Sequence, residues 1–319
     1  MANIGYLQVT RDCNQRCRFC SNPPSGVDRT LEEDKGLLDD FAARGYQGVI
    51  LTGGEPTLVA HLPELVRHAV AVGLEPRLIT NGQRLAEPSY LARLHEAGLR
   101  IVHLSLHSHR AEVHDFIAGR RRAWEFAVTA MAACAALPGM SLRVNTVLCR
   151  HNADHLDQAM QLLVDEFPSV RHVILNGLDP SNERCEQNRD VWYRLRDIEV
   201  SLARAMRLLD GAGVTFRVER VPLCYMLDHA HLSTETRKLV KGEERMVHFL
   251  DDKGTVRQEP GAFRHRKHAR CASCSLDAIC AGVFERGEMY DPEELAPVFV
   301  DADAIRRRVL GESATARGR

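Results

Sequence analysis

Short apolar runs alternate with helix-length amphipathic segments through the first two thirds of this 319-residue chain. Such alternation predicts βα units, whose strands form a parallel sheet covered by right-handed crossovers. Six units fall short of the eight of a closed barrel, so a partial barrel and an open doubly wound sheet both remain. The expected strands are 4–10, 47–52, 76–80, 100–106, 141–148 and 170–176, and the expected helices are 31–44, 62–73, 88–98, 123–137, 153–167 and 191–212.

The regular alternation of predicted strands and helices ends after residue 213. The run 214–219 could form one more strand, and 246–258 predicts a hairpin with its turn at Asp252-Lys253-Gly254. A second group of cysteines follows the hairpin, so we expect a small appended domain organised by metal more than by a core. The predicted division is 1–213 for the barrel, 214–310 for the appended domain and 311–319 for a frayed tail.

The composition is that of a globular protein, with 45% hydrophobic and 27% charged residues. A net charge of −1 argues against a global field that attracts nucleic acid or a membrane surface. No apolar run reaches membrane-spanning length, and we expect no cleavable leader, so the cytoplasm is the expected location. Ten cysteines in a reducing compartment favour metal or cluster ligation over disulfides.

The cysteines sort by spacing. Three of them, Cys13, Cys17 and Cys20, fall on one loop after the first expected strand, where three thiolates can converge on an iron–sulfur cluster. A cubane cluster has four irons, so three cysteines leave one iron free to bind a small molecule. The alternative is a zinc site with a distant fourth ligand. The isolated cysteines are interpreted as small buried hydrophobes: Cys134, Cys149 and Cys185.

Other polar residues gather where expected strands end. The motif GGEP (53–56) follows the second strand, an Asn-Gly pair begins at Asn81 after the third, and Ser105 ends the fourth. The carboxyl ends of parallel strands share one rim, so these groups are expected to converge there. Asn145 lies on the fifth strand and Asn176 ends the sixth.

The motifs CNQRCRFC and LTGGEPTL together resemble the hallmarks of the radical S-adenosylmethionine (radical SAM) superfamily. The segments ITNG, LSLHSHRAEVHDFIAG and LRVNTVLCRHN also resemble it, so the likeness runs from about residue 4 to 176. It implies a partial (β/α)6 TIM-like barrel, one [4Fe–4S] cluster on the three loop cysteines, and SAM bound at the free iron. The SAM-contacting residues that it implies are Phe19, Gly53, Gly54, Glu55, Pro56, Asn81, Ser105 and Asn145.

The second group, Cys271, Cys274 and Cys280, again lacks a fourth member, and Cys224 is the natural candidate. This pattern resembles the SPASM and Twitch auxiliary-cluster domains of some radical SAM enzymes, although Phe284 stands where the longer form continues with cysteine. The resemblance implies one auxiliary [4Fe–4S] cluster, either ligated by all four cysteines or open to substrate. Zinc is the alternative for this group also.

Such a protein would split SAM with an electron from a flavodoxin- or ferredoxin-type donor and abstract hydrogen from its substrate. Peptide modification is ranked first, because the fourth strand to the fifth helix looks most like peptide-maturing relatives. Dehydrogenation or rearrangement of a small molecule is the alternative, since cluster cysteines that begin at residue 13 predict no preceding leader-binding domain. A zinc-binding scaffold is the alternative of another class. Histidines 103, 107, 109 and 114 are expected at the surface or supporting the site, and Tyr225 and Tyr290 as packing residues rather than radical relays.

Overall fold

A nine-stranded sheet forms the centre of the computed structural model, which describes residues 4–27, 29–180, 182–243, 245–250, 254–258, 265–285 and 288–311. The strand order is β7-β6-β5-β4-β3-β2-β1-β8-β9, and β1 to β7 run parallel in chain order. Within the described residues the end strands β7 and β9 do not pair with each other, so the barrel is partial, as predicted. The first seven strands are β1 (Ile4–Thr10), β2 (Gly48–Gly53), β3 (Glu75–Thr80), β4 (Ile101–Ser105), β5 (Ser141–Val147), β6 (Val170–Asn176) and β7 (Thr215–Glu219).

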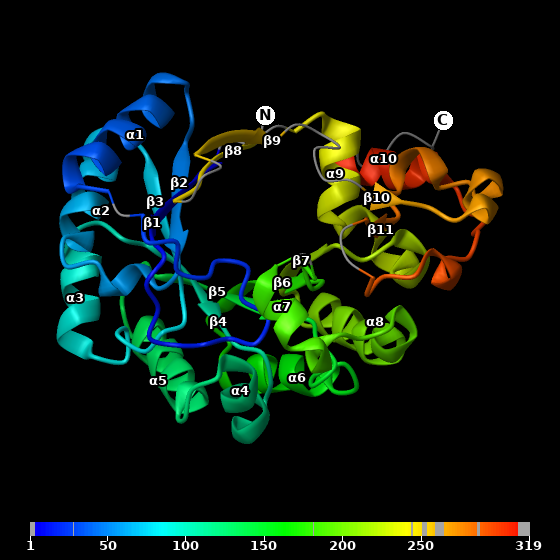
Figure 1. The fold of residues 1–319 in the computed structure, drawn as a ribbon, viewed down its shortest axis with the longest axis horizontal. Coiled ribbons are helices and arrows are strands. Elements are labelled where there is room, and N and C mark those ends of the chain that lie inside the picture. Colours follow the sequence, from blue (N-terminus) through cyan, green and yellow to red (C-terminus); the bar gives the residue numbers. More distant parts are fainter. Residues whose placement is uncertain are drawn as a thin grey trace, which may run out of the picture.

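Helices cover the outside of this sheet (Figure 1). Along β5, Leu142, Val144 and Thr146 are fully buried, whereas Arg143 and Asn145 alternate with them on the other face. The first set joins the core with the helices, so the second set faces the interior of the partial barrel, here called the inner face. The covering helices are α1 (Leu31–Ala43), α2 (Leu62–Ala71), α3 (Pro88–Glu96), α4 (Ala111–Ala118), α5 (Ala123–Ala135), α6 (Leu156–Glu166) and α8 (Leu195–Gly211).

Four helices of the described residues were not predicted, and one was predicted too long. The unpredicted helices have only five to nine residues, too few for a clear period: α4, α7 (Glu183–Gln187), α9 (Thr234–Lys241) and α10 (Ala302–Leu310). The expected helix 191–212 begins only at Leu195, because the Asp197 carboxylate accepts from the Arg194 N–H and caps the helix there.

The first strands of the C-terminal part belong to the barrel sheet. The strand expected at 214–219 is present as β7, and the predicted hairpin is present as β8 (Arg245–His248) and β9 (Thr255–Gln258); its expected turn residues Asp252 and Lys253 lie outside the described residues. Strand β8 pairs in parallel with β1, so this hairpin extends the barrel sheet. The predicted boundary at residue 213 stays a prediction.

Small elements of the C-terminal part lie beside the barrel (Figure 1). Strands β10 (His265–Arg266) and β11 (Val283–Phe284) pair antiparallel, and α9 (Thr234–Lys241) packs against α10 (Ala302–Leu310). In the part of the chain that the structure describes, no helix combines the length and the apolar composition that a bilayer crossing requires.

Candidate active site

The loop that carries Cys13, Cys17 and Cys20 leaves the end of β1 and is fastened to the end of α4. The backbone N–H groups of Arg16 and Arg18 donate to the carbonyls of Ala118 and Ile117, each at 3.0 Å. Gly119 ends α4 with a φ of 61°, and a Cβ there would lie 2.4 Å from the Arg16 carbonyl oxygen. Helix α4, which the sequence did not reveal, therefore holds the middle of the cysteine loop.

Two of the three sulfur atoms already accept backbone hydrogen bonds. The N–H of Gln15 donates to Cys13 Sγ and the N–H of Asn22 donates to Cys20 Sγ, both at 3.4 Å. Such N–H···S contacts stabilise thiolates and tune the potential of an iron–sulfur cluster. Burial raises the pKa of the Cys13 thiol to about 11 and that of Cys17 further, and nearby thiols add to both shifts. Three thiolates in this position therefore require a positively charged partner.

The two glycines of GGEP press directly on the cysteine loop. The N–H of Gly54 donates to the Thr10 carbonyl (2.6 Å), and the N–H of Glu55 donates to the Asp12 carbonyl (2.7 Å). A Cβ on Gly53 would lie 2.0 Å from the Thr10 carbonyl oxygen, and one on Gly54 would lie 2.2 Å from that of Asp12. Gly53 also has a φ of 130°, a conformation that favours glycine. Glycine is required here for contact between two parts of the backbone.

The Glu55 carboxylate is the hub of a buried network, with 1% of the residue exposed. It accepts hydrogen bonds from the hydroxyls of Thr57 (2.6 Å) and Thr80 (2.7 Å) and from the N–H of Asn81 (2.8 Å). Burial raises the pKa of Glu55, and these donors oppose that shift by stabilising its charged form. Glu55 thus ties the end of β3 to the GGEP turn.

Asn81 links this network to the cysteine loop. Its side-chain Nδ2 donates to Asn14 Oδ1 (2.7 Å) and lies 3.9 Å from Cys13 Sγ. Its Oδ1 accepts from the N–H of Gln83, which is the turn contact expected of an Asn-Gly pair. Asn81 therefore serves the turn and also touches the site.

The remaining predicted SAM contacts share the inner face at the strand ends. Ser105 on β4 is the register partner of Asn145 on β5, and Asn176 on β6 donates to the Asn145 side chain. The Phe19 ring meets the edge of His107 at a centroid distance of 5.0 Å. The structure brings these residues to the rim that carries the cysteine loop, as the sequence predicted for strand ends.

The histidine group was expected at the surface or supporting the site, and three of its members are buried. His103, His107 and His114 are 2–4% exposed. His107 stacks on His114, whose Nδ1 accepts from the His107 N–H at 3.1 Å. Burial lowers the pKa of His107 far below its ordinary value and that of His114 to about 4. His107 and His114 act as neutral packing groups behind Phe19, because His114 lies on α4, which covers this side of the strand end.

A cleft of about 390 Å³ opens beside Cys13 and Cys20. Three arginines line it, Arg11, Arg16 and Arg184, and no carboxylate of the described residues does. Arg184 lowers the pKa of the Cys13 and Cys17 thiols, against the larger effect of burial. Sequence reasoning missed Arg184, although Asn182 caps α7 through the Cys185 N–H (2.9 Å), a signal that could have identified the helix.

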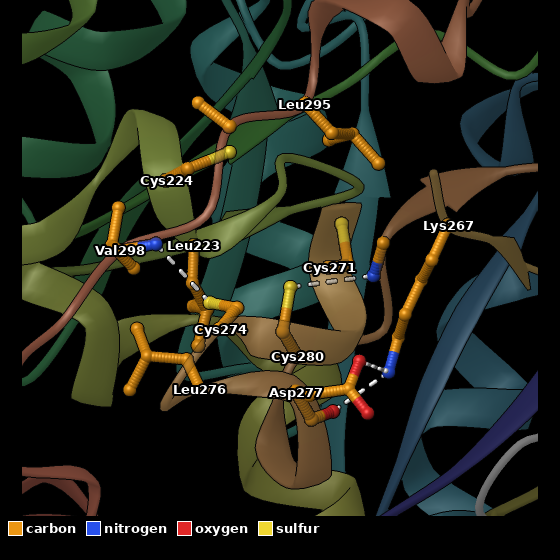
Figure 2. A pocket seen from close by; sticks show the side chains of 12 residues that line it. Leu223, Cys224, Lys267, Cys271, Cys274, Leu276, Asp277, Cys280, Leu295 and Val298 are labelled. Carbon is orange, nitrogen blue, oxygen red and sulfur yellow. Dashed lines mark hydrogen bonds and ion pairs between the residues drawn. The ribbon is translucent and has the colours of Figure 1, made fainter. Parts of the chain in front are cut away.

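The second cysteine group lines one small pocket (Figure 2). Cys224 reaches it from the 3-10 helix η3 (Leu223–Tyr225), whereas Cys271, Cys274 and Cys280 come from the loop between β10 and β11. The N–H of Val298 donates to Cys274 Sγ and that of Gly282 to Cys280 Sγ, both at 3.4 Å. The other lining residues are mainly apolar: Leu223, Leu276, Leu295, Ala296 and Val298.

Neither cysteine set is arranged as the site of a single ion. Across the described residues, no three His, Cys, Asp or Glu side chains are grouped closely enough to hold one metal ion. A cubane places its irons at alternate corners of a cube, so its thiolates stand farther apart than the ligands of one zinc.

The other cysteines and tyrosines behave as the sequence predicted. Cys134, Cys149 and Cys185 are fully buried. The Tyr290 hydroxyl donates to the Leu178 carbonyl (2.8 Å), and the Tyr225 hydroxyl donates to the Glu294 carbonyl (2.9 Å). These contacts are those of packing residues.

Comparison with known proteins agrees with this geometry. Residues 7–163 match the family model of the Radical SAM superfamily. The PqqA peptide cyclase of Xanthomonas euvesicatoria is 37% identical over 182 residues, which cover 54% of this chain and 47% of that protein. That of Bradyrhizobium diazoefficiens is 35% identical over 163 residues, covering 50% and 42%. The chain thus spans about half the length of the curated relatives that it matches.

Solved structures resemble a larger part of the chain. Native anSMEcpe with bound AdoMet and Kp18Cys peptide superposes with a TM-score of 0.66 at 16% identity, covering 97% of this chain and 96% of the other. Streptococcus suis SuiB bound to precursor peptide SuiA gives 0.62 at 14% identity, covering 92% and 75%. These likenesses concern the fold. The matched family model leads to one conclusion of its own: residues 7–163 of this chain form a radical SAM domain.

Proposed function

We propose that this chain is a radical SAM enzyme that modifies a peptide. The observation that carries the proposal is the cysteine loop itself: three cysteines follow one strand and are clamped by the backbone of Gly53 and Gly54. In this proposal the three thiolates hold a [4Fe–4S] cluster and leave one iron for the amino and carboxylate groups of SAM. When bound, the reduced cluster supplies the electron that splits SAM into methionine and a 5′-deoxyadenosyl radical.

The protein's own residues position and enclose this chemistry. Asn81, Ser105 and Asn145 present amide and hydroxyl groups toward the rim, where they can bind the polar parts of SAM. Phe19 and His107 form an apolar wall that excludes water, which protects a reactive radical. Arg184 places a positive charge beside the thiolates and stabilises their ionised form. Glu55 and Pro56 hold the GGEP turn in place and need not touch SAM.

The four cysteines of the second cavity would hold one auxiliary [4Fe–4S] cluster. Its support is that Cys224, far from the others in sequence, lines the same cavity as Cys271, Cys274 and Cys280. With four thiolates the cluster is saturated, so it would relay an electron rather than bind substrate. A flavodoxin- or ferredoxin-type protein would supply the electron, and the cytoplasm would be the location. The division into 1–213 and 214–310 belongs to the same proposal.

Support for a peptide substrate comes from the relatives. The curated relatives are named as cyclases of the PqqA peptide, and two structures of similar fold carry bound peptides, with likeness over more than nine tenths of this chain. A small molecule in natural-product or cofactor biosynthesis is the competing substrate class.

The test is product formation by the reconstituted protein under strict anaerobiosis. The reduced enzyme is incubated with SAM and assayed for 5′-deoxyadenosine, first alone and then with peptide and small-molecule fractions of a cell extract labelled with deuterium. Deuterium that enters 5′-deoxyadenosine from the peptide fraction supports the proposal. Transfer only from the small-molecule fraction refutes the peptide assignment, and failure to cleave SAM refutes the enzyme assignment.

A further inference from the structure

On the inner face, away from the rim at the carboxyl ends of the strands, neighbouring strands carry a row of basic side chains. His103 on β4 is the register partner of Arg143 on β5, which is in turn the partner of His172 on β6. Register partners point to the same face of a sheet, so these three side chains lie side by side. Arg77 on β3 pairs with Ile101, two residues before His103, and Arg217 on β7 pairs with Ile174, two residues after His172, so both flank the three on the same face. We call these five residues the cation row.

Few carboxylates balance these charges within the described residues. The Glu75 carboxylate contacts Arg77 at 2.6 Å, and Glu243 acts on Arg217 at longer range. Arg143 makes no side-chain hydrogen bond or ion pair with any described residue, and its Nε is buried. The contacts and charges of these carboxylates therefore fall mainly on the two outer residues of the row, Arg77 and Arg217, and the centre of the row keeps an unbalanced positive charge.

His103 is the second sign that a partner is missing. The residue is 3% exposed, and both of its ring nitrogens lack a hydrogen-bond partner among the described residues. A buried polar atom without a partner is costly and rare in native proteins, since it loses water and gains nothing. The two unpartnered nitrogens of His103 and the unpartnered Nε of Arg143 belong to register partners, so they lie next to each other on the inner face.

The pKa shifts of these side chains also indicate a missing anion. Burial, and then the charge of Arg143, lowers the pKa of His103 to about 3 and that of His172 to about 4. Burial and then Arg77 lower the pKa of Arg143. Each group thus destabilises the charge of the next, and a bound anion would reverse these shifts. Guanidinium groups with imidazoles are suited to the oxygens of phosphate or carboxylate.

We propose that the cation row is a binding site for an oxyanion, a phosphate or a carboxylate group, centred between His103 and Arg143. It lies two residues below Ser105 and Asn145 on the same strands, at a separation of about 7 Å from the rim. The site is therefore distinct from the cysteine loop and from the residues expected to contact SAM. It is independent of the proposed function.

The experiment measures binding of two probes to the protein with its clusters reconstituted. Inorganic phosphate and glutarate, a dicarboxylate, are titrated separately by calorimetry in a buffer without oxyanions. Variants Arg143→Gln and Arg217→Gln test the row. Arg171→Gln is the matched control, because Arg171 is an exposed arginine at the start of β6 and is not part of the cation row.

Saturable binding of phosphate, weakened roughly tenfold or more in Arg143→Gln and unchanged in Arg171→Gln, supports a phosphate site, since loss of one charge-assisted hydrogen bond has about this effect. The same pattern with glutarate alone supports a carboxylate site. If neither probe binds, or if both variants bind like the control, the proposal is overturned.

A measurement without ligand separates this role from a structural one. Because Arg143 has no partner among the described residues and is repelled by its neighbours, Arg143→Gln should melt at the same temperature as the unmodified protein or above it. The probe that binds should raise the melting temperature of the unmodified protein and of Arg171→Gln but not that of Arg143→Gln. A variant that melts lower without ligand would show that Arg143 supports the fold and would overturn the proposal.

Discussion

Replacing Gly54 by alanine should remove the cluster from the cysteine loop while the fold survives. The added Cβ would lie 2.2 Å from the Asp12 carbonyl oxygen, about 1.2 Å short of an ordinary contact of 3.4 Å. Two backbone hydrogen bonds, from the Gly54 and Glu55 N–H groups to Thr10 and Asp12, prevent the strands from separating without loss. The beginning of the cysteine loop must therefore shift by about 1 Å.

Overlap of this kind costs roughly 1–3 kcal/mol of folding stability, and a misplacement of about 1 Å at a reacting centre can lower a rate about 100-fold. The assay is iron and sulfide content after anaerobic reconstitution, together with 5′-deoxyadenosine formed under dithionite. With two cubanes of four irons the unmodified protein should hold about eight irons, and Gly54→Ala should hold about four, those of the auxiliary cluster.

Gly36→Ala is the matched control. Gly36 lies inside α1, where a Cβ would meet nothing within 4 Å, so alanine should stabilise that helix by about 0.5–1 kcal/mol and leave the iron content unchanged. Should Gly54→Ala retain about eight irons and full SAM cleavage, the view that GGEP acts by clamping the loop is refuted.

Three further predictions concern single side chains. Cys17→Ala should abolish 5′-deoxyadenosine formation under dithionite; any persistent cleavage above the protein-free background would contradict the assigned ligand set. Cys224→Ala should lower the iron content toward about four while SAM cleavage continues, and an unchanged iron count and spectrum would exclude Cys224 as a ligand. Tyr290→Phe removes the hydroxyl that donates to Leu178 and contacts Tyr193 at 3.1 Å. It should lower the unfolding free energy by about 1–2 kcal/mol in denaturant titrations and leave SAM cleavage intact. A large loss of cleavage with normal stability would instead favour a radical relay.

The parallel sheet could be predicted because its strands are short and rich in apolar residues and its long helices have a clear period. The short helices could not, since five to nine residues show no clear period: α4, α7, α9 and α10. Which histidines are buried could not be predicted either. His103 and His107 stand beside polar neighbours in the sequence, and only the folded sheet shows that both are enclosed.

Some residues of the candidate site could be predicted from the sequence, and others required the structure. The loop cysteines and the GGEP glycines were identified from local spacing, but the reason for the glycines was incomplete. Their close contact is with the carbonyls of Thr10 and Asp12, which a sequence motif cannot show. Cys224 was a candidate only because it follows the last strand, and the shared cavity with Cys271 required coordinates.

The amino-acid sequence alone determined the alternation of strands and helices and the spacing of Cys13, Cys17 and Cys20, because neighbours along the chain are held within a few residues of one another by covalent bonds. The tertiary structure alone decided that Arg184 faces the thiolates and that His103, Arg143 and His172 lie in register. These residues are far apart in the chain, and their proximity depends on strand register and on the packing of helices, which arise only when the whole sheet is assembled.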